Sequence, residues 1–472
     1  MLRSTPTRWF SSLAFALCLL FPADAGERMN VLLLVVDDLN TWLLGDSSRY
    51  AGKVIAPNIR VFAKGSIVFN HAYTASPYCS PSRTAFLSGV SPWHSGVYDN
   101  AVDTKSSDRL NQATSLPHLF KRTGYSTASY GKIAHGWKLK GAWDEEIPHR
   151  RDPVPPTAPL SPAGQGEHDW GPTHLDESEM RDTLYADRAI ARLGQETTKP
   201  FFIACGLFHP HMPWYVPQKY FDLFPLDDVV LPDRMENDLA DLPPLARRVL
   251  TKQKIFQRTR ETGQYRHAVQ GYLATTAYAD AQVGRVLNAL DASPHRDNTV
   301  VILISDHGFH LGEKDHWQKA TLWEEATHSI MMIRMPGHPN NGLPCDRCVS
   351  LQDIYPTLAE VCRLPEPDDV DGRSLVPLLD DPNAEWKSTS ISALYERFVT
   401  IRTERFRYIR YAEDQEELYD MIEDPHQWTN LIEGRGHENE VSRLRGLVPA
   451  ESDMAVPLAS KKQKKSSLSS AR

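Results

Sequence analysis

The chain has 472 residues, of which 52 are Lys or Arg and 60 are Asp or Glu, so its formal net charge is −8. Its composition is 41% hydrophobic and 24% charged, which excludes a disordered chain and a fibre. The acidic balance argues against a nucleic-acid binder, because neutralising phosphates needs clustered Lys and Arg. This length suits one large α/β domain with a smaller companion domain.

The two ends of the chain differ in composition from the rest. Residues 1–25 combine Arg3 and Arg8, an apolar stretch and the A-x-A sequence Ala23–Ala25, which together predict a signal peptide. The apolar part is too short for a membrane anchor, so we expect a secreted or periplasmic protein with no membrane anchor. The Ser- and Lys-rich residues 456–472 predict a disordered basic tail.

Four apolar runs each end abruptly in polar residues. Runs that are apolar on both faces are typical of a parallel sheet that is covered by helices on each side. These runs cover residues 31–36, 125–130, 201–208 and 299–305. Because sites in such sheets lie beyond the carboxyl ends of the strands, we expect the polar endings to converge in space.

Helices and irregular segments fill the gaps. Residues 114–123 begin with Thr and Ser and are followed by Gly124, a good C′ residue, so they predict a helix. Apolar residues at helical spacing predict a second helix over 264–290. The Pro-, Gly- and His-rich residues 148–175 predict a long irregular excursion, and such loops in enzymes are usually functional or disordered.

The hydrophobic pattern of the sequence changes after Asp380. Residues 381–455 contain short alternating stretches at 398–402 and 405–411, followed by a predicted helix near 438–447. The alternation indicates antiparallel strands. We therefore expect a small C-terminal subdomain that follows one large domain.

Three of the six cysteines lie close together in the sequence, at Cys345, Cys348 and Cys362. The Cys345-x-x-Cys348 spacing resembles half a zinc site, but no second such pair and no paired His completes it. An oxidising compartment then favours one disulfide among the three, whose pairing the spacing does not give.

The most informative stretch reads SPYCSPSRTAFLSG. Ser80 is predicted to be an N-cap with Pro81 at the first helical position, and Gly89 closes the helix. Cys79 then lies at a helix N-terminus, where free N–H groups and the helix dipole favour an anion, and Arg83 follows one turn later. Taken alone, Cys79 is either a thiolate nucleophile or a simple thiol at a capped helix.

Carboxylates follow two of the predicted strands. Asp37 and Asp38 follow the first run, and Asp306 and His307 follow the last. Oxygen-rich donors suit a hard divalent cation, Ca²⁺ before Mg²⁺, although the imidazole of His307 is a borderline ligand. Adjacent carboxylates after a strand also cap helices and turns. The second pair and the cysteine motif favour a metal site.

The pattern C-x-P-S-R, followed by a Ser-Gly helix end, resembles the signature of the type I, formylglycine-dependent sulfatases. Within that family the chain is most similar to the iduronate-2-sulfatase group. The resembling stretches are GKIAH (131–135), PFFIACGLFHPHMPW (200–214), YADAQVGRVLNALD (278–291) and SDHGFHLGEKDHWQK (305–319).

This resemblance implies an α/β, alkaline-phosphatase-like fold with a large, mostly parallel sheet flanked by helices. Residues 26–380 would form the catalytic domain, and a small antiparallel sheet would form the C-terminal subdomain. The resemblance also implies that a formylglycine-generating or equivalent maturation enzyme oxidises Cys79. The hydrated aldehyde would supply the hydroxyl that attacks sulfur.

The family pattern further implies roles for individual residues. His135 matches the residue that acts on the formylglycine hydroxyls, and His211 the one that protonates the leaving alcohol. Arg83, a further catalytic residue beside Cys79, would help to meet the charge that builds on the sulfuryl oxygens. Lys132 and Lys319 would bind the sulfate. His209, also placed among the substrate-binding residues, stands where iduronate-type relatives have Lys. The implied metal ligands are Asp37, Asp38, Cys79, Asp306 and His307.

The activity implied is hydrolysis of sulfate esters of carbohydrates, exo-acting on 2-O-sulfated uronic acid residues of a sulfated polysaccharide. One alternative is a phosphoester or phosphonate hydrolase of the same superfamily, although Pro81 favours sulfate because related phosphonate hydrolases tend to have Ala there. Another is a non-catalytic sulfated-glycan-binding protein, should Cys79 stay unmodified. Trp214, Phe309 and Trp317 either line a sugar-facing wall or pack under loops.

Overall fold

The structure is a computed structural model that describes residues 28–45, 49–250 and 254–460. The predicted signal peptide, 1–25, lies outside the described residues, as does most of the predicted tail. No helix in the described part of the chain is both long enough and apolar enough to cross a membrane.

An eight-stranded sheet forms the centre of the large domain, in the order β14-β2-β13-β9-β1-β7-β4-β5. The four apolar runs are its central strands: β1 (Asn30–Val36), β4 (Ser126–Gly131), β7 (Phe201–Leu207) and β9 (Thr299–Ser305). These strands are parallel to one another, and only β13 runs antiparallel to its neighbours. The prediction of a mostly parallel sheet is confirmed. The remaining strands are β2 (Ile67–Phe69), β5 (Glu145–Pro148), β13 (Met331–Arg334) and β14 (Pro344–Cys345).

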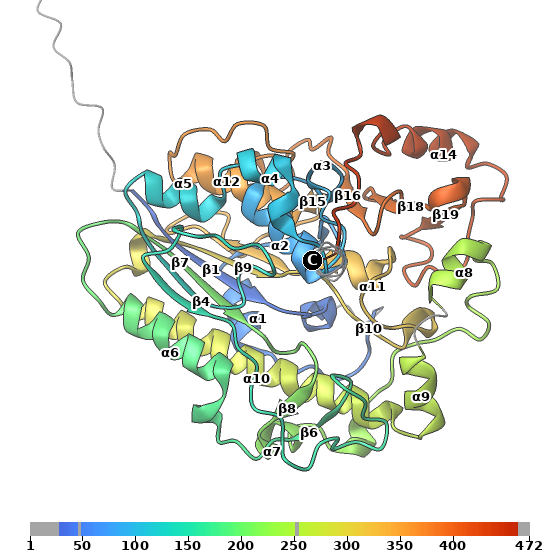
Figure 1. The fold of residues 1–472 in the computed structure, drawn as a ribbon, viewed down its shortest axis with the longest axis horizontal. Coiled ribbons are helices and arrows are strands. Elements are labelled where there is room, and N and C mark those ends of the chain that lie inside the picture. Colours follow the sequence, from blue (N-terminus) through green and yellow to red (C-terminus); the bar gives the residue numbers. More distant parts are fainter. Residues whose placement is uncertain (1–27, 46–48, 251–253, 461–472) are drawn as a thin grey trace, which may run out of the picture.

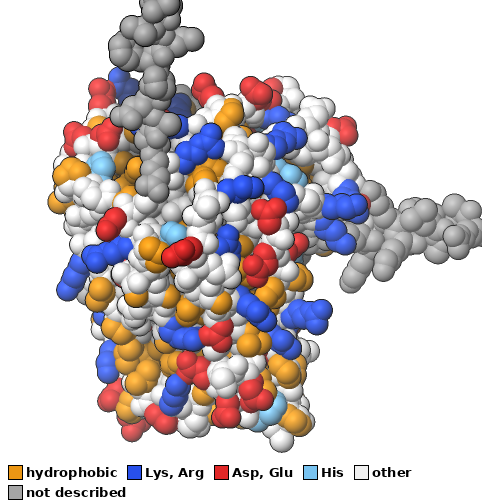
Figure 2. All heavy atoms as spheres, turned by 90° about the vertical axis from the view of Figure 1, so that its left-hand side faces the viewer, with side chains coloured by type: hydrophobic (Ala, Val, Ile, Leu, Met, Phe, Trp, Pro, Cys, Tyr) orange, Lys and Arg blue, Asp and Glu red, His pale blue; other side chains and the backbone are white. Residues whose placement is uncertain are grey.

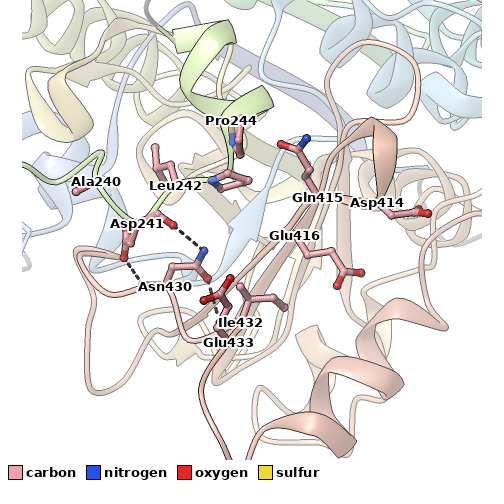
Figure 3. Close-up of a pocket in the computed structure, with 11 residues that line it drawn as sticks. Ala240, Asp241, Leu242, Pro244, Asp414, Gln415, Glu416, Asn430, Ile432 and Glu433 are labelled. Atoms are coloured by element: carbon pink, nitrogen blue, oxygen red, sulfur yellow. Dashed lines mark hydrogen bonds between the residues drawn. The ribbon is translucent and has the colours of Figure 1, made fainter.

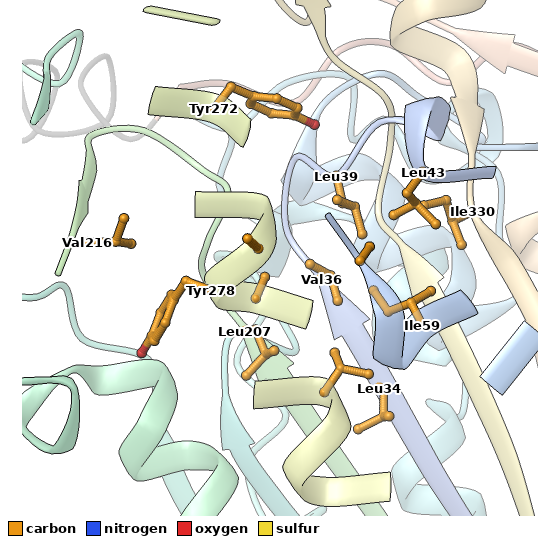
Figure 4. Packing of buried hydrophobic residues seen from close by; sticks show 14 of the residues in the cluster. Leu34, Val36, Leu39, Leu43, Ile59, Leu207, Val216, Tyr272, Tyr278 and Ile330 are labelled. Carbon is orange, nitrogen blue, oxygen red and sulfur yellow. The ribbon is translucent and has the colours of Figure 1, made fainter. Parts of the chain in front are cut away.

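Helices cover both faces of this sheet (Figure 1). The helices α6 (Arg181–Leu193) and α10 (Tyr265–Asp291) cover one face, and α2 (Cys79–Ser88), α5 (Leu116–Arg122) and α12 (Ile354–Val361) cover the other. Successive residues of β1 alternate between the two cores, as the pleat of a strand requires. Figure 4 shows the core under α10, where Leu34 and Val36 of β1 pack near Leu207 and Tyr278.

The C-terminal subdomain is a four-stranded antiparallel sheet with one helix, as the sequence predicts. Its strands are β16 (Ser390–Ala393), β17 (Val399–Arg402), β18 (Phe406–Arg410) and β19 (Glu416–Asp420), and its helix is α14 (Glu438–Arg445). A cluster that includes Trp323, Ile409 and Tyr419 packs this subdomain against the large domain.

Short elements complete the fold. Three small sheets pair β3 (Ala72–Tyr73) with β12 (His328–Ser329) and β15 (Val349–Ser350), β6 (Trp170–Pro172) with β8 (Trp214–Val216), and β10 (His310–Leu311) with β11 (Trp317–Gln318). The other α-helices are α1 (Pro57–Ala63), α3 (Pro92–Ser95), α4 (Asp108–Gln112), α7 (Gln218–Phe221), α8 (Pro244–Leu250), α9 (Ile255–Glu261), α11 (Glu324–Thr327) and α13 (Val376–Asp380).

The disulfide expected among Cys345, Cys348 and Cys362 is wrong. All three are free and buried in the structure. The Cys345 thiol contacts the carbonyl oxygen of Pro382 at 3.3 Å, and the Cys362 thiol lies beside Tyr125. Burial raises the pKa of each of these thiols to about 11 or 12, so they act as small apolar core groups.

The prediction of a disordered tail is wrong for the first residues of that tail. Residues 456–460 lie against the large domain, where the backbone N–H of Leu458 donates to the carbonyl of Gly96 at 3.1 Å and Ser460 pairs with Val102. These backbone bonds hold the segment in place.

On the face shown in Figure 2, basic and acidic side chains are interspersed.

Candidate active site

The polar endings of the strands converge at one edge of the sheet, as predicted. Asp37 follows β1, Lys132 follows β4 and Asp306 follows β9. The register explains the convergence, because β1 pairs in parallel with both β9 and β7, and β7 pairs in parallel with β4. Each strand therefore delivers its next residue to the same place.

Helix α2 places Cys79 in the middle of this edge. The helix begins at Cys79, with Tyr78 as its N-cap, and ends at Gly89, whose φ of 72° suits glycine. Ser80 is not the N-cap that the sequence predicts, because its hydroxyl donates instead to the carbonyl of His135 at 2.7 Å. The position of Cys79 at a helix N-terminus is confirmed, and its side chain is buried.

Arg83, one turn further along α2, is buried among carboxylates. Its Nε lies 2.9 Å from Oδ2 of Asp306, and its Nη2 lies 3.1 Å from Oδ1 of Asp37. Its Nη1 donates to the carbonyls of Lys132 and Ile133. Sequence reasoning expected Arg83 to meet the charge of the substrate. The structure instead uses its guanidinium to hold two carboxylates in place.

Two lysines flank the cysteine. The ammonium of Lys132 forms an ion pair with Asp37 and lies 3.8 Å from the Cys79 Sγ. The ammonium of Lys319 forms an ion pair with Asp38 and lies 3.2 Å from the same Sγ. Burial and Asp37 raise the pKa of the Cys79 thiol, but Lys132 and Lys319 outweigh them, so the pKa is lowered. Both lysines are therefore directed at residue 79.

Lys319 is placed by an unusual stretch of backbone. Its neighbours Gln318 and Ala320 have φ values of 74° and 73°, in the left-handed region that non-glycine residues rarely adopt. Such conformations cost about 1–3 kcal/mol each and cluster at functional sites. The loop after β11 thus accepts strain at the point where it presents Lys319 to the cysteine.

Asp38 is also in the left-handed region, with φ at 61°. Tyr272 of α10 holds this turn, because its hydroxyl donates to the Asp38 carbonyl at 3.0 Å and accepts the N–H of Asn40 at 2.7 Å. The turn directs the Asp38 carboxylate toward Lys319 and His307. A core tyrosine therefore supports the site from behind.

Two histidines present one ring nitrogen each to this cluster. Nε2 of His307 lies 3.4 Å from the Cys79 Sγ and 3.4 Å from Oδ1 of Asp38, while its Nδ1 bonds to the Gly308 carbonyl. Nε2 of His211 lies 3.9 Å from Oδ2 of Asp38, while its Nδ1 bonds to the Met212 carbonyl. Because a carbonyl only accepts, Nδ1 is the donor in both rings and orients each Nε2 toward the site.

The other two predicted histidines differ in their surroundings. His135 is half-buried, and its Nδ1 has no hydrogen-bond partner among the described residues. Burial, together with the charge of Lys132, lowers the pKa of His135 to about 4. His209 is buried, and its Nδ1 lies 2.8 Å from Oδ2 of Asp182. Sequence reasoning placed His209 among the substrate-binding residues, whereas in the structure its ring is hydrogen-bonded to Asp182 of helix α6.

The donor atoms fit a bound cation. Ligand atoms of Asp37, Asp38, Cys79 and His307 all lie within 4.8 Å of one another. Asp306 adjoins them, with its Oδ1 accepting the Asp38 N–H at 3.2 Å. Burial raises the pKa of Asp38 to about 7 even though Lys319 lowers it. A divalent cation would favour its charged form, and a donor set this rich in carboxylate suits a hard metal.

Sequence reasoning missed the residues around Phe208, which comes directly after β7. The Phe208 ring stacks on His149 at a centroid distance of 4.8 Å, and the ammonium of Lys132 lies 5.3 Å from the ring centre. The Arg151 guanidinium lies 5.8 Å from the same centre. Both His149 and Arg151 belong to the segment 148–175, and the only sequence signal for them is its composition.

The three aromatic residues considered for a sugar-facing wall belong to the core. Trp214, Phe309 and Trp317 are buried, and the ring centroid of Trp214 lies 6.0 Å from that of Phe309 and 5.9 Å from that of Trp317. The packing alternative is therefore the correct one.

A separate hollow of about 560 Å³ lies between the segment before α8 and the C-terminal sheet (Figure 3). Asn430 is one of the residues that line it, and the Asn430 backbone N–H donates to the Asp241 carboxylate at 2.7 Å. Its lining includes the carboxylates of Asp241, Asp414, Glu416 and Glu433, and no Lys or Arg belongs to that lining. This hollow is electrostatically unsuited to an anionic substrate.

Comparisons with known proteins agree with this geometry. The family model described as Sulfatase matches residues 29–363, and one described as N-sulphoglucosamine sulphohydrolase, C-terminal, matches residues 312–451. A sulfatase of Formosa agariphila is 31% identical over 443 residues, which cover 90% of this chain and 87% of the relative. The iduronate 2-sulfatase of Mus musculus is 29% identical over 399 residues, with coverages of 73% and 70%.

A solved structure shows the same fold. The phosphonate monoester hydrolase of Agrobacterium radiobacter matches with a TM-score of 0.74 at 22% identity, covering 89% of this chain and 94% of that one. This likeness establishes the alkaline-phosphatase-like fold without distinguishing sulfate from phosphonate chemistry. The family match and the sulfatase relative show that the chain belongs to the sulfatase family of sulfuric ester hydrolases.

Proposed function

We propose that this protein is a secreted sulfatase that removes 2-O-sulfate from terminal uronic acid residues of a sulfated polysaccharide, after Cys79 has been converted to formylglycine. The observation that carries the proposal is the position of the Cys79 Sγ, within 3.8 Å of two buried lysine ammonium groups and beside His307. The similarity to an iduronate 2-sulfatase supports the choice of a 2-O-sulfated uronate.

The metal would be held by Asp37, Asp38, Asp306, His307 and residue 79, and Ca²⁺ suits these ligands better than Mg²⁺. When bound, it supplies Lewis-acid stabilisation of negative charge on the sulfate. Lys132 and Lys319 neutralise the nonbridging oxygens from either side of residue 79. Because both ammonium groups are already in place and buried, they need little reorganisation during the reaction.

Three further side chains have roles in the proposed reaction. Arg83 pairs with the carboxylates of Asp37 and Asp306 and fixes their positions. His211 directs its Nε2 into the site and, as an imidazolium whose Nδ1–H stays bonded to the Met212 carbonyl, gives the Nε2 proton to the departing sugar oxygen. His135, whose Nδ1 has no partner among the described residues, takes a proton from the second hydroxyl of the hydrated aldehyde. Loss of that proton lets the sulfate leave and restores the aldehyde, which a serine or cysteine side chain would not allow.

The experiment that tests this function is sulfate release, measured by ion chromatography with Ca²⁺ present. The purified native protein is offered uronate and hexosamine oligosaccharides sulfated at the 2-, 4- or 6-position, with Cys79→Ala as the inactive control. We expect release from the 2-O-sulfated terminal uronate. Release from the 4- or 6-position alone would contradict the proposed regiochemistry.

Two parallel measurements address the other interpretations. Peptide mass spectrometry of the native protein is expected to show formylglycine at residue 79, and an unmodified cysteine with binding but no turnover would indicate a glycan-binding protein. Phosphonate or phosphate monoester hydrolysis faster than sulfate release would indicate a hydrolase of the other substrate class. Recovery of the protein without residues 1–25 from the periplasm or medium tests secretion.

A further inference from the structure

The segment that follows β5 brings a second cation to the active site. Strand β5 lies beside β4 in parallel register, with Pro148 opposite Gly131. The chain therefore leaves β5 at the same edge of the sheet where Lys132 leaves β4. The next residues along this path, at the start of the long irregular segment, include His149 and Arg151.

Phe208 connects this segment to the catalytic cluster. Its ring lies against the Lys132 ammonium, with a centroid distance of 5.3 Å, and against the His211 ring at 4.6 Å. The same ring stacks on His149 and contacts the Arg151 guanidinium at 5.8 Å. Phe208 is itself buried, so its neighbours hold the ring in place by packing. Arg151 is thereby held at the rim of the site, one aromatic ring away from Lys132.

Arg151 remains available to a ligand. Its side chain is 50% exposed, and its partner Glu167, at 2.5 Å, is 56% exposed. Exposed ion pairs of this kind contribute little to stability, because water and salt screen them. Incoming anions therefore compete readily with Glu167. By contrast, Lys132 and Lys319 are buried and already directed at residue 79.

We propose that Arg151 binds the carboxylate of the sugar whose sulfate is held between Lys132 and Lys319. The proposal rests on the proposed function, since it requires a uronate substrate. A guanidinium presents a planar fork that matches the two oxygens of a carboxylate, and an aromatic face beneath it fixes its plane. The site then recognises two anions of one sugar, the sulfate by buried lysines and the carboxylate by an exposed arginine.

The test compares two matched substrates. One is a 2-O-sulfated uronic acid glycoside, and the other is the same glycoside with its carboxyl group reduced to a primary alcohol. We measure kcat/KM of the native enzyme, of Arg151→Gln and Arg151→Lys, and of Arg296→Gln as a control. Arg296 is an exposed arginine before β9, at the opposite edge of the sheet, so it reports the loss of one positive charge far from the site.

The native enzyme and the control are expected to prefer the uronate by about 10- to 100-fold, the range of a charge-assisted pair. Arg151→Gln should reduce this preference to about one, and Arg151→Lys should retain part of it because a lysine lacks the fork. Glu167→Gln should lower KM for the uronate by releasing Arg151.

An unchanged preference in Arg151→Gln, or an equal loss on both substrates, would overturn the carboxylate site while leaving the sulfatase function intact. Failure of the native enzyme to release sulfate from either glycoside would instead contradict the proposed substrate, and the carboxylate site with it.

A third substrate shows whether Arg151 prefers a carboxylate or a sulfate. It is the reduced glycoside with a second sulfate in place of the carboxylate. An Arg151-dependent preference for that disulfated sugar over the uronate would also overturn the proposal.

Discussion

Nε of Arg83 and Oδ2 of Asp306 lie 2.9 Å apart, and neither side chain has any exposure to solvent. The same guanidinium reaches Oδ1 of Asp37 at 3.1 Å. One cation of α2 therefore neutralises carboxylates that follow two strands, β1 and β9. Without it, buried negative charges would face one another across the edge of the sheet.

Replacing Arg83 with Met is expected to lower the free energy of unfolding by about 3–5 kcal/mol, the cost of leaving buried charges unpaired. The free energy of unfolding of Arg83→Lys should lie between those of Arg83→Met and the native protein, because an ammonium cannot bind both carboxylates in the same geometry. Denaturant unfolding measures the difference. Arg296→Gln, at an exposed position, should stay within about 0.5 kcal/mol of the native protein. Equal stability of Arg83→Met and native protein would show that the pair is not structurally important.

Lys319 is expected to act on the reaction rate. In Lys319→Met the ammonium beside residue 79 is lost, and kcat should fall by about 10²- to 10³-fold, as when one oxyanion-stabilising donor is removed. Steady-state kinetics on the sulfated substrate provides the measurement. Lys219→Met removes a lysine that is 64% exposed and should leave kcat within about twofold. A rise in KM at constant kcat would show that Lys319 binds the substrate and the transition state equally and does not act on the chemical step.

The strands and the convergence of the polar residues that follow them could be predicted because their signals are local. The apolar run of β9 ends at Ser305, as the sequence indicates, and the residues after it carry the metal-type donors. Parallel strands then bring such endings together without further information. The family resemblance added expected roles for Cys79, Lys132 and Lys319, and these roles stay predictions.

The contacts that could not be predicted join residues far apart in the chain. Asp182 looks like an ordinary acid in the first turn of an amphipathic helix, yet it binds His209 from another element. Arg83 looks like a substrate contact until its carboxylate partners are located. The clustered cysteines suggested a disulfide because their sequence spacing does not show that all three thiols are free and buried.

Asp182 is therefore expected to be a positioning residue. Its carboxylate accepts the N–H groups of Phe208 and His209 at 2.8 and 2.9 Å and holds the His209 ring. Asp182→Ala should lower the free energy of unfolding by about 1–3 kcal/mol, because buried donors lose their acceptor.

The segment after β7 that carries His211 should then be less well placed, so kcat should fall in Asp182→Ala together with stability. Thermal unfolding and kinetics measure the two effects. Asp187→Asn is the matched control on the same helix, where Asp187 forms an exposed pair with Arg285. A similar loss in both variants would show that the effect belongs to the helix and not to the contact with Phe208 and His209.

Glu324, at the start of α11, is expected to make stability depend on acidic pH. Its side chain is buried, its Oε2 pairs with Arg407 and, at 3.2 Å, with Arg402, and the Tyr73 hydroxyl donates to its Oε1 at 2.8 Å. Burial acts to raise the pKa of Glu324, but the two arginines outweigh it and hold the pKa well below its usual range.

A carboxyl group whose pKa is lowered on folding stabilises the native state above its unfolded pKa, about 4.3 for Glu. That stabilisation is lost progressively as the pH falls from there toward the lower pKa of the folded state. We therefore expect the free energy of unfolding to decrease across this acidic range, and the decrease to be smaller in Glu324→Gln, which should also be about 3–5 kcal/mol less stable at neutral pH. Glu404→Gln, at a carboxylate that is 54% exposed, should keep the native pH dependence. Denaturant unfolding at a series of pH values tests this, and identical slopes for Glu324→Gln and the native protein would exclude Glu324 as the titrating group.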